Sequence, residues 1–394
     1  MPASAQNNVS KDPEKSKNTP AVKVQGLADV VALDSHIAFV NGKIGQLSYR
    51  GYDIRDLAQN TSYEEVFCLL HDGDLPNQAR LDQAKEQLRA ALVLPEGIWS
   101  ILRRIPKDAN PMASLRTAVS ALSLFDDEAD DGSPEANYRK SIRIVARVPS
   151  IIAAIDRLRK GKEPVAPRTD CSHAHNFLYM LNGERPGEMA ERTFDTCLVL
   201  HAEHGLNAST FASRVIGATL SDMYSAVTGG IAALKGPLHG GANQEVMRML
   251  LEIDCSGQRP ADYIAAKLAK KERIMGFGHR VYKTMDPRAG ILKDMSKGLG
   301  EEIGSLKWYE MSLEMMEIMK AEKGLYPNVD FFSASIYYAL GIAIDLYTPI
   351  FALSRTAGWS AHLKEQWEDN RLIRPKAAYV GPQGKRTLPI GQRA

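Results

Sequence analysis

Apolar residues recur at helical spacing along most of the chain, whereas runs with the two-residue period of a strand are nearly absent. Apolar positions three or four residues apart fall on one face of a helix, which can then be buried. The pattern predicts first-half helices over residues 77–92, 111–125, 137–160 with a kink near Pro149, 188–204, 206–220 and 221–235. It predicts later helices over residues 244–253, 261–271, 290–303, 305–323, 329–346 and 348–362. The protein is therefore predicted to be all-α.

Two local signals refine this picture near the N-terminus. Ser62 followed by Glu65 forms a capping box for a helix over residues 63–71, which Asp72-Gly73 ends. The pair Asn41-Gly42 lies between two short β-prone runs and predicts a hairpin over residues 37–47. This small hairpin is the only regular β structure that we expect.

The chain of 394 residues is too long for a single core and suggests more than one domain. Glycine and proline breaks delimit residues 236–335 as a small helical domain. Residues 27–235 and 336–394 are expected to form a large helical domain. Residues 1–26 are polar, lack the apolar core of a secretory signal and contain no arginine, so we expect a disordered arm.

Composition excludes several classes of protein. The net charge of +2 comes from 49 basic and 47 acidic side chains, which argues against binding nucleic acid by neutralising its phosphates. The four cysteines are widely spaced, which favours free thiols in a reducing compartment and a cytoplasmic location. The apolar stretch 336–353 is interrupted by Asp345 and Pro349, so a buried helix is expected there and not a membrane span.

The first stretch with candidate chemistry is Leu234 to Val246, where one imidazole stands at a break in the backbone. His239 is followed by Gly240-Gly241, which leaves the first turn of the next helix open to a ligand. The positive end of that helix should keep His239 neutral and able to donate a hydrogen bond to a carbonyl. The alternative is a helix stop followed by a surface loop.

The second stretch, Gly276 to Ala289, combines two glycines, His279 and several cations, and Asp286-Pro287 looks like a helix start. Basic side chains beside a glycine-rich turn suit a phosphate or carboxylate. The stretch lacks the third glycine of a dinucleotide-binding loop. The alternative is a solvated basic loop.

The third stretch, Tyr326 to Phe332, places Asp330 at a helix start beside two aromatic rings. Burial beside apolar rings raises the pKa of a carboxyl group, which suits a general base. The alternative is a helix cap formed by Asn328 or Asp330.

Two further sets of residues have a simple structural interpretation. His201 and His204 are three residues apart on a predicted helix, and with His173 and His175 they resemble a zinc site, although buried structural histidines are the commoner case. Arg355 and Arg374 are single arginines that can be ordinary surface cations.

Together the three stretches resemble, in order and spacing, the catalytic motifs of the citrate synthase family. The motifs are Lys235 to Asn243, Gly278 to Lys283 with Asp286-Pro287-Arg288, and Asn328-Val329-Asp330. The likeness runs from about Gly26 to the end of the chain, and its length is similar to that of the compact bacterial and archaeal form.

The resemblance implies a mostly helical homodimer, in which a small domain closes on a large one and oxaloacetate binds before acetyl-CoA. It assigns catalysis to three residues: Asp330 takes a proton from the acetyl methyl group, His239 hydrogen-bonds the thioester oxygen and His279 polarises the oxaloacetate carbonyl. Water then hydrolyses citryl-CoA.

The same resemblance implies the binding residues. Oxaloacetate would be held by His204, Arg288 and Arg355, with Arg374 contributed by the partner subunit, and Lys283 would contact a CoA phosphate. It implies no metal and no cofactor apart from acetyl-CoA as substrate.

Three alternatives stay open at this point. The nearest is 2-methylcitrate synthase, which uses propionyl-CoA with the same catalytic groups, because one methylene changes binding by only about 1–3 kcal/mol. The others are a non-catalytic helical assembly protein and a zinc hydrolase. The sequence does not define allosteric effectors or assembly beyond the dimer.

Overall fold

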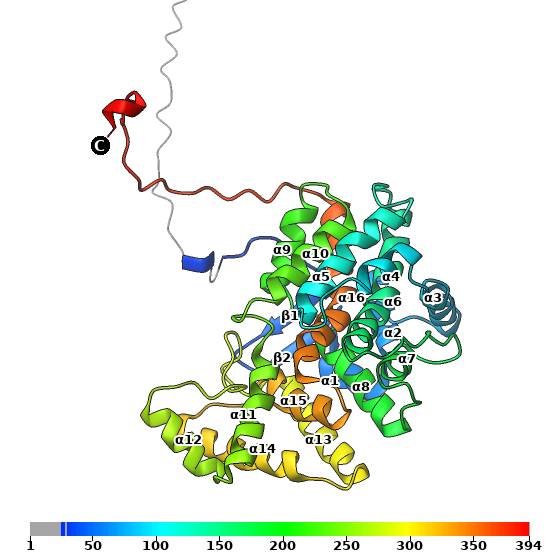
Figure 1. Cartoon of the computed structure of the whole chain (residues 1–394), viewed down its shortest axis with the longest axis vertical. Helices are drawn as coiled ribbons and strands as arrows, with labels where there is room; N and C mark the ends of the chain where they lie inside the picture. Colours follow the sequence, from blue (N-terminus) through cyan, green and yellow to red (C-terminus); the bar gives the residue numbers. More distant parts are fainter. Residues whose placement is uncertain (1–24, 28–29, 394) are drawn as a thin grey trace, which may run out of the picture. The chain divides into compact units, whose positions relative to one another are not determined.

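The computed structural model describes residues 25–27 and 30–393, and sixteen α-helices lie within these ranges (Figure 1). The chain divides into two units, residues 1–35 and residues 36–394. The predicted arm 1–26 lies outside the described residues, except for Gln25 and Gly26, which belong to a short 3₁₀ turn, Gln25–Leu27. All sixteen helices belong to the second unit, so the all-α prediction is confirmed.

The first ten helices alternate with short connections. They are α1 (Ile54–Asn60), α2 (Tyr63–Asp72), α3 (Gln78–Ala90), α4 (Glu96–Leu102), α5 (Pro111–Leu122), α6 (Pro134–Arg159), α7 (His173–Asn182), α8 (Glu188–His201), α9 (Ala208–Gly217) and α10 (Met223–Leu234). The last six are α11 (Ala242–Ser256), α12 (Pro260–Ala269), α13 (Pro287–Glu302), α14 (Lys307–Lys323), α15 (Val329–Ala339) and α16 (Tyr347–Glu368). The capping box of Ser62 and Glu65 forms as predicted at the start of α2.

The predicted hairpin is confirmed, with strands β1 (Ala38–Asn41) and β2 (Gln46–Tyr49) in antiparallel register. A short third strand, β3 (Tyr52–Asp53), pairs with β2. Asn41 pairs with Gln46, so the loop contains four residues, and Gly45 takes the left-handed conformation at φ +64°. The Asn-Gly pair marked the hairpin correctly but is not a two-residue turn.

Helix α16 forms the centre of the core. It packs against α2, α6, α8, α9 and α10, and nearly all of its side chains are buried, including Trp359 and Arg355. A helix that is buried on every face has to be apolar or internally bonded, and the hydroxyls of Ser354 and Ser360 bond to backbone carbonyls accordingly.

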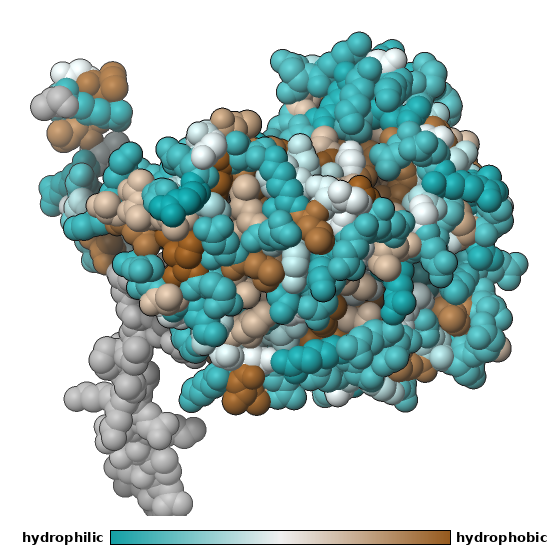
Figure 2. Space-filling model, turned by 90° about the horizontal axis from the view of Figure 1, so that it is seen from below, coloured by the Kyte–Doolittle hydropathy of each residue, from teal (hydrophilic) through white to brown (hydrophobic). Residues whose placement is uncertain are grey.

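Helices α11 to α15 pack on one another in the lower part of Figure 1. α15 contacts α11 and α13, while α14 contacts α12 and α13. α13 also contacts α1 and α8 of the larger group of helices. Viewed from that lower side, the surface is mostly hydrophilic, with apolar side chains in small separate areas (Figure 2).

Several predicted helices end earlier than expected, among them the two predicted over residues 188–204 and 329–346. α8 ends at His201, so His204 lies in the following loop and the two imidazoles do not share a helical face. α15 ends at Ala339, and Gly341 follows in the left-handed conformation at φ +74°. α6 continues through Pro149. Helices α1, α4 and α7 were not among the predicted ranges.

The segment after α16 has a different character. Residues 371–393 are almost all exposed and extend away from the helices (Figure 1). Within residues 25–27 and 30–393, no helix combines the length and the apolar character that crossing a membrane requires.

Candidate active site

The first motif forms a tight turn between α10 and α11. The backbone N–H of His239 donates to Gly236 O at 2.9 Å, and Thr348 Oγ1 of α16 donates to Gly240 O at 2.9 Å. Gly241 precedes α11 and no side chain caps the first turn. The predicted helix start with open backbone N–H groups is therefore present.

The hydrogen bonds of His239 define its tautomer. Its Nε2 accepts the backbone N–H of Ser209 at 3.2 Å and lies 2.8 Å from the Ser209 hydroxyl. That hydroxyl also accepts the indole N–H of Trp359 at 3.3 Å. Because Nε2 is an acceptor, the proton of the neutral ring belongs on Nδ1.

Two causes keep His239 neutral. Burial, followed by the positive charge of Arg355, lowers its pKa to about 4. We predicted a neutral ring, but from the dipole of the helix that follows it. The helix terminus that His239 contacts belongs to α9, where Ser209 lies in the first turn.

His279 carries the complementary tautomer. Its Nδ1 accepts the backbone N–H groups of Val281 and Tyr282 at 3.0 and 3.1 Å. The proton of the neutral ring therefore belongs on Nε2. Burial, followed by the charge of Arg288, lowers its pKa to about 4.

The second and third motifs are bonded to each other through their backbones. Gly278 N–H donates to Tyr326 O at 2.9 Å, and Asn328 N–H donates to Gly276 O at 2.9 Å. The Asn328 side chain also donates to Gly278 O at 3.0 Å. Both glycines have φ near +80°, a conformation that other residues rarely adopt. The segment carrying His279 is thus fixed against the segment that begins α15.

Asp330 lies in the first turn of α15, where Asn328 is the cap and accepts the Asp330 N–H at 3.0 Å. The capping interpretation is therefore correct for Asn328 and leaves the Asp330 carboxylate unused. Among the described residues, none donates a hydrogen bond to that carboxylate. Burial raises its pKa to about 6, as predicted for a carboxyl group beside the buried rings of Phe331 and Phe332.

Arg288 is held by its own helix start. Its guanidinium forms two hydrogen bonds with the Asp286 carboxylate, at 2.8 and 3.0 Å, and both side chains are buried. Asp286 also accepts the N–H of Val329 at 3.3 Å. This bidentate pair fixes the orientation of the guanidinium next to α15.

Arg355 is not a surface cation, because it lies on α16 with only 1% of its surface exposed. Its Nε donates to His201 O at 2.8 Å, and its guanidinium lies 4.8 Å from the centre of the Phe351 ring. Its Nη2 is buried without a hydrogen-bond partner among the described residues. A buried charged donor without a partner is costly, so this nitrogen suits an anionic ligand.

His204 lies beside the second motif. Its ring centre is 5.4 Å from that of His279 and 5.6 Å from that of Tyr282. Burial, followed by the charge of Arg288, places its pKa well below the ordinary value. His204 is therefore a third neutral imidazole, and it packs against His279.

Two of the predicted binding residues are exposed, in contrast to these buried side chains. Lys283 and Arg374 are exposed, and Arg374 belongs to the extended C-terminal segment. Two buried arginines influence the pKa values of most of the other predicted residues. The charge of Arg355 acts on His239, and the charge of Arg288 acts on His204, His279 and Asp330.

Some contributors were missed from the sequence. Ser209, which orients His239, carried no recognisable signal. Tyr282, whose hydroxyl lies 3.1 Å from His204 Nε2, belongs to the second motif, which predicts no role for it. Asp286 was recognised as a helix start, although its spacing to Arg288 also allowed the ion pair.

The four histidines of the zinc alternative do not converge. His201 Nδ1 lies 2.7 Å from Cys197 O, and His175 Nδ1 lies 2.6 Å from Glu191. In the described part of the chain, no three His, Cys, Asp or Glu side chains gather as a metal site requires.

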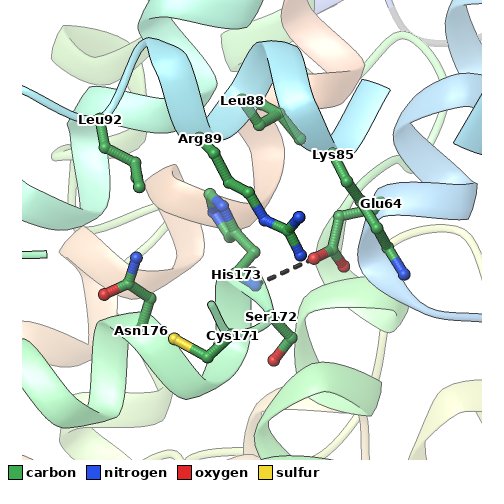
Figure 3. Close-up of a pocket in the computed structure, with 9 residues that line it drawn as sticks. All are labelled: Glu64, Lys85, Leu88, Arg89, Leu92, Cys171, Ser172, His173 and Asn176. Atoms are coloured by element: carbon green, nitrogen blue, oxygen red, sulfur yellow. Dashed lines mark hydrogen bonds between the residues drawn. The ribbon is translucent and has the colours of Figure 1, made fainter. Parts of the chain in front are cut away.

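Figure 3 shows a pocket at a different place, between α2, α3 and the start of α7. The backbone N–H of His173 donates to Glu64 there at 2.9 Å. None of the residues that the motifs predict for catalysis or substrate binding lines it. Its lining residues are Glu64, Lys85, Leu88, Arg89, Leu92, Cys171, Ser172, His173 and Asn176.

Comparison with known proteins decides the family. The model described as "Citrate synthase, C-terminal domain" matches residues 26–376. The chain belongs to the citrate synthase family. The resemblance inferred from the three motifs is thereby confirmed, and the region matched agrees with the predicted start near Gly26.

Individual members of the citrate synthase family are similar over nearly their whole length. Citrate synthase 2 of Bacillus subtilis is 53% identical over 371 residues, covering 94% of this chain and 99% of the relative. The crystal structure of citrate synthase from Pyrobaculum aerophilum is 38% identical with a TM-score of 0.88, covering 99% of this chain and 100% of that one. This similarity confirms the mostly helical fold.

A further solved structure contains ligands. It is the ternary complex of citrate synthase from Thermoplasma acidophilum with carboxymethyl coenzyme A and oxaloacetate, 34% identical with a TM-score of 0.86, covering 93% of this chain and 98% of that one. Relatives at lower identity than citrate synthase 2 of Bacillus subtilis include its citrate/2-methylcitrate synthase, 43% identical, and 2-methylcitrate synthase 1 of Corynebacterium glutamicum, 42% identical.

Proposed function

We propose that this protein condenses acetyl-CoA with oxaloacetate and hydrolyses the resulting citryl-CoA to citrate and CoA. The observation that carries the proposal is the environment of Asp330, a carboxylate without a hydrogen-bond donor among the described residues, whose pKa is raised to about 6. It stands on a segment bonded to the one that carries His279. A base with this pKa suits removal of a weakly acidic proton next to a thioester.

In the first step, Asp330 takes a proton from the acetyl methyl group. The electron pair moves onto the thioester oxygen, which accepts a hydrogen bond from the Nδ1–H of His239. A neutral donor with a pKa near 4 stabilises the developing enolate without first giving up its proton. Ser209 supports this role because its backbone N–H keeps Nε2 an acceptor.

In the second step, the enolate carbon attacks the ketone carbon of oxaloacetate. As the carbon–carbon bond forms, the ketone oxygen accepts a hydrogen bond from His279 Nε2–H, which stabilises the negative charge that develops on that oxygen. The oxygen then takes up a proton from water, and Asp330 releases the proton that it removed from the methyl group, so the step balances. Water then cleaves the thioester of citryl-CoA, and CoA leaves.

Oxaloacetate carries two carboxylates and needs forked cations. Arg355 supplies a buried Nη2 without a partner among the described residues, Arg288 supplies an oriented guanidinium, and His204 supplies a neutral ring beside them. Lys283 is exposed next to this cluster and is assigned to a CoA phosphate. The ternary complex of the Thermoplasma relative supports this choice of ligands.

The acyl preference is tested by comparing acetyl-CoA and propionyl-CoA. CoA release with oxaloacetate gives kcat/KM for each thioester, and we expect the higher value for acetyl-CoA. A higher value for propionyl-CoA would show that 2-methylcitrate synthesis is the activity instead, as the names of some relatives suggest.

The protein is proposed to act as a homodimer in which Arg374 reaches the partner's oxaloacetate. The C-terminal segment that carries Arg374 exposes apolar side chains, including Val380 at 88% and Ile390 at 78%. Apolar side chains on an extended segment favour burial against a second copy.

Mixing two inactive variants tests this assignment. In a heterodimer of His239→Ala and Arg374→Ala subunits, one site has both defects, and the other has neither if Arg374 acts across the interface. Remixing after mild dissociation should then restore about half of the activity per heterodimer. No recovery in verified heterodimers would place Arg374 in its own subunit's site.

The remaining assignments concern organisation and location. We place the small domain at residues 236–335 and expect it to close on the large domain as substrates bind, because α11 to α15 pack chiefly on one another. Cys68 and Cys197 are buried free thiols, which fits a reducing cytoplasm.

A further inference from the structure

Tyr282 forms one side of a three-ring cluster with His204 and His279. Its ring centre is 4.6 Å from that of His279 and 5.6 Å from that of His204. Its side chain is only 3% exposed, and its hydroxyl lies 3.1 Å from His204 Nε2. No step of the proposed reaction uses this hydroxyl.

The direction of the hydrogen bond follows from the partners that are available. His204 is the only hydrogen-bond partner of the Tyr282 hydroxyl among the described residues. If His204 donated from Nε2, the buried phenol proton would have no acceptor in that part of the chain. Burial also raises the pKa of Tyr282, so the phenol keeps its proton. The arrangement that satisfies both groups has Tyr282 donating to Nε2.

We propose that Tyr282 is a positioning residue for the oxaloacetate site, whose hydroxyl holds His204 in the Nδ1–H tautomer and in one ring orientation. Nδ1–H then becomes the hydrogen-bond donor that His204 offers to the substrate. This inference rests on the proposed function for the identity of the substrate, but its structural part concerns His204 alone.

The backbone around Tyr282 is itself fixed by the β1–β2 hairpin. The N–H of Lys283 donates to Gly42 O at 2.8 Å. The approach at Gly42 is so close that a Cβ there would lie 2.1 Å from Val281 O. Tyr282 thus lies between one residue that touches the hairpin and another that bonds to it, which limits its movement.

The test variant is Tyr282→Phe, which keeps the ring and removes only the hydroxyl. We expect the KM for oxaloacetate to rise about tenfold, because His204 loses the partner that orients it. The KM for acetyl-CoA should stay within about twofold. The rise in melting temperature caused by oxaloacetate alone should also shrink, and this readout does not require turnover.

Tyr263→Phe is the matched control. It removes another hydroxyl from a buried tyrosine, one that donates to Glu252 at 2.7 Å and makes no contact with the ring cluster. It should leave both KM values unchanged even if its melting temperature falls. An equal rise in the oxaloacetate KM of both variants would mean that general loosening is the cause, and the proposal would be wrong.

A double-mutant cycle tests whether Tyr282 acts through His204. His204→Asn should raise the KM for oxaloacetate, and adding Tyr282→Phe to it should have little further effect. Independent, multiplying effects would contradict the proposal, as would an oxaloacetate KM for Tyr282→Phe within about twofold of the wild type.

The tautomer can be measured without a variant of Tyr282. Ring ¹⁵N shifts of labelled wild-type protein, assigned by the signals lost in His204→Asn, should show a protonated Nδ1 in His204. A protonated Nε2 would overturn the proposal. If the wild type released no CoA from acetyl-CoA and oxaloacetate, the proposed function would fail, while this measurement would still test the role of Tyr282.

Discussion

The Nε2 of His239 accepts the backbone N–H of Ser209 at 3.2 Å, so the reactive proton of the imidazole stands on Nδ1. Replacing His239 with Ala removes the donor that stabilises the enolate, and we expect kcat to fall roughly 100- to 1,000-fold. Ser209→Ala keeps the backbone N–H and should lower kcat less than about tenfold. Steady-state assays with circular dichroism spectra check both.

The control for this prediction is His175→Ala. His175 pairs with Glu191 at 2.6 Å, outside the cluster, and its loss should leave kcat unchanged. Near-normal turnover in folded His239→Ala protein would remove His239 from the mechanism.

The rate of the reaction should depend on a single group with a pKa near 6. Burial raises the pKa of Asp330 to about 6, and a general base works only as the carboxylate. The pKa values of His239 and His279 are lowered to about 4, so both rings stay neutral through this range. The logarithm of kcat/KM should therefore fall with unit slope below about pH 6. A plateau that extended down to pH 4.5 would contradict the assignment.

The raised pKa also means that the ionised Asp330 carboxylate destabilises the folded protein. Between about pH 4 and pH 6 the folded protein keeps a proton that the unfolded chain releases, so the free energy of unfolding falls as pH rises through this window. Asparagine at this position carries no charge. At pH 7 the free energy of unfolding of Asp330→Asn should therefore exceed that of the wild type by on the order of 1–2 kcal/mol, a value reduced because this side chain is partly exposed. At pH 4 the difference should vanish.

Urea unfolding at a fixed protein concentration, from pH 4 to pH 7, measures this effect. Asp262→Asn is a control of opposite sign, because a hydrogen bond from Arg259 lowers the pKa of Asp262. A gain for Asp330→Asn that did not change with pH would show that the charge is not its cause.

Arg355 offers a buried nitrogen without a hydrogen-bond partner in the described part of the chain. Lysine at this position keeps the charge but loses the fork, so Arg355→Lys should raise the KM for oxaloacetate about 10- to 100-fold and change the KM for acetyl-CoA little. Arg147→Lys on α6 is the matched control, since Arg147 also has a buried nitrogen without such a partner. Equal KM values for the wild type and Arg355→Lys would exclude Arg355 from the binding site.

The sequence predicted features that depend on neighbouring residues. The capping box of Ser62 and Glu65, the helix start at Asp286-Pro287 and the hairpin at Asn41-Gly42 are all present. Each results from hydrogen bonds or backbone preferences over a few residues, which a local pattern records.

The sequence did not predict features of the backbone that depend on residues far away in the chain. α8 was expected to reach His204, but its last turn ends at His201. The hydroxyl of Tyr49, about 150 residues away, donates to Glu203 O at 2.9 Å and accepts the Glu203 N–H at 3.3 Å. The apolar pattern of residues 188–204 carries no information about this contact with Tyr49. The tautomers of the site histidines are set in the same way, by backbone N–H groups brought near through folding.

Gly42 shows how the hairpin reaches the active-site loop, and it provides the last prediction. The Asn-Gly pair suggested that this glycine serves a turn, but the left-handed residue of the loop is Gly45. Gly42 is needed because no side chain fits at this position. A Cβ there would lie 2.1 Å from the backbone oxygen of Val281. Gly42→Ala must therefore displace residues 281–283, which hold His279 Nδ1 and carry Tyr282. We expect kcat/KM to fall at least about tenfold, with a loss of stability of about 1–3 kcal/mol from the overpacking.

Gly132→Ala is the control, because nothing lies within 4 Å of a Cβ at Gly132 and both variants lower the entropy of the unfolded chain alike. Full activity in Gly42→Ala would mean that the loop tolerates the displacement, and the hairpin would then have no part in positioning the two histidines.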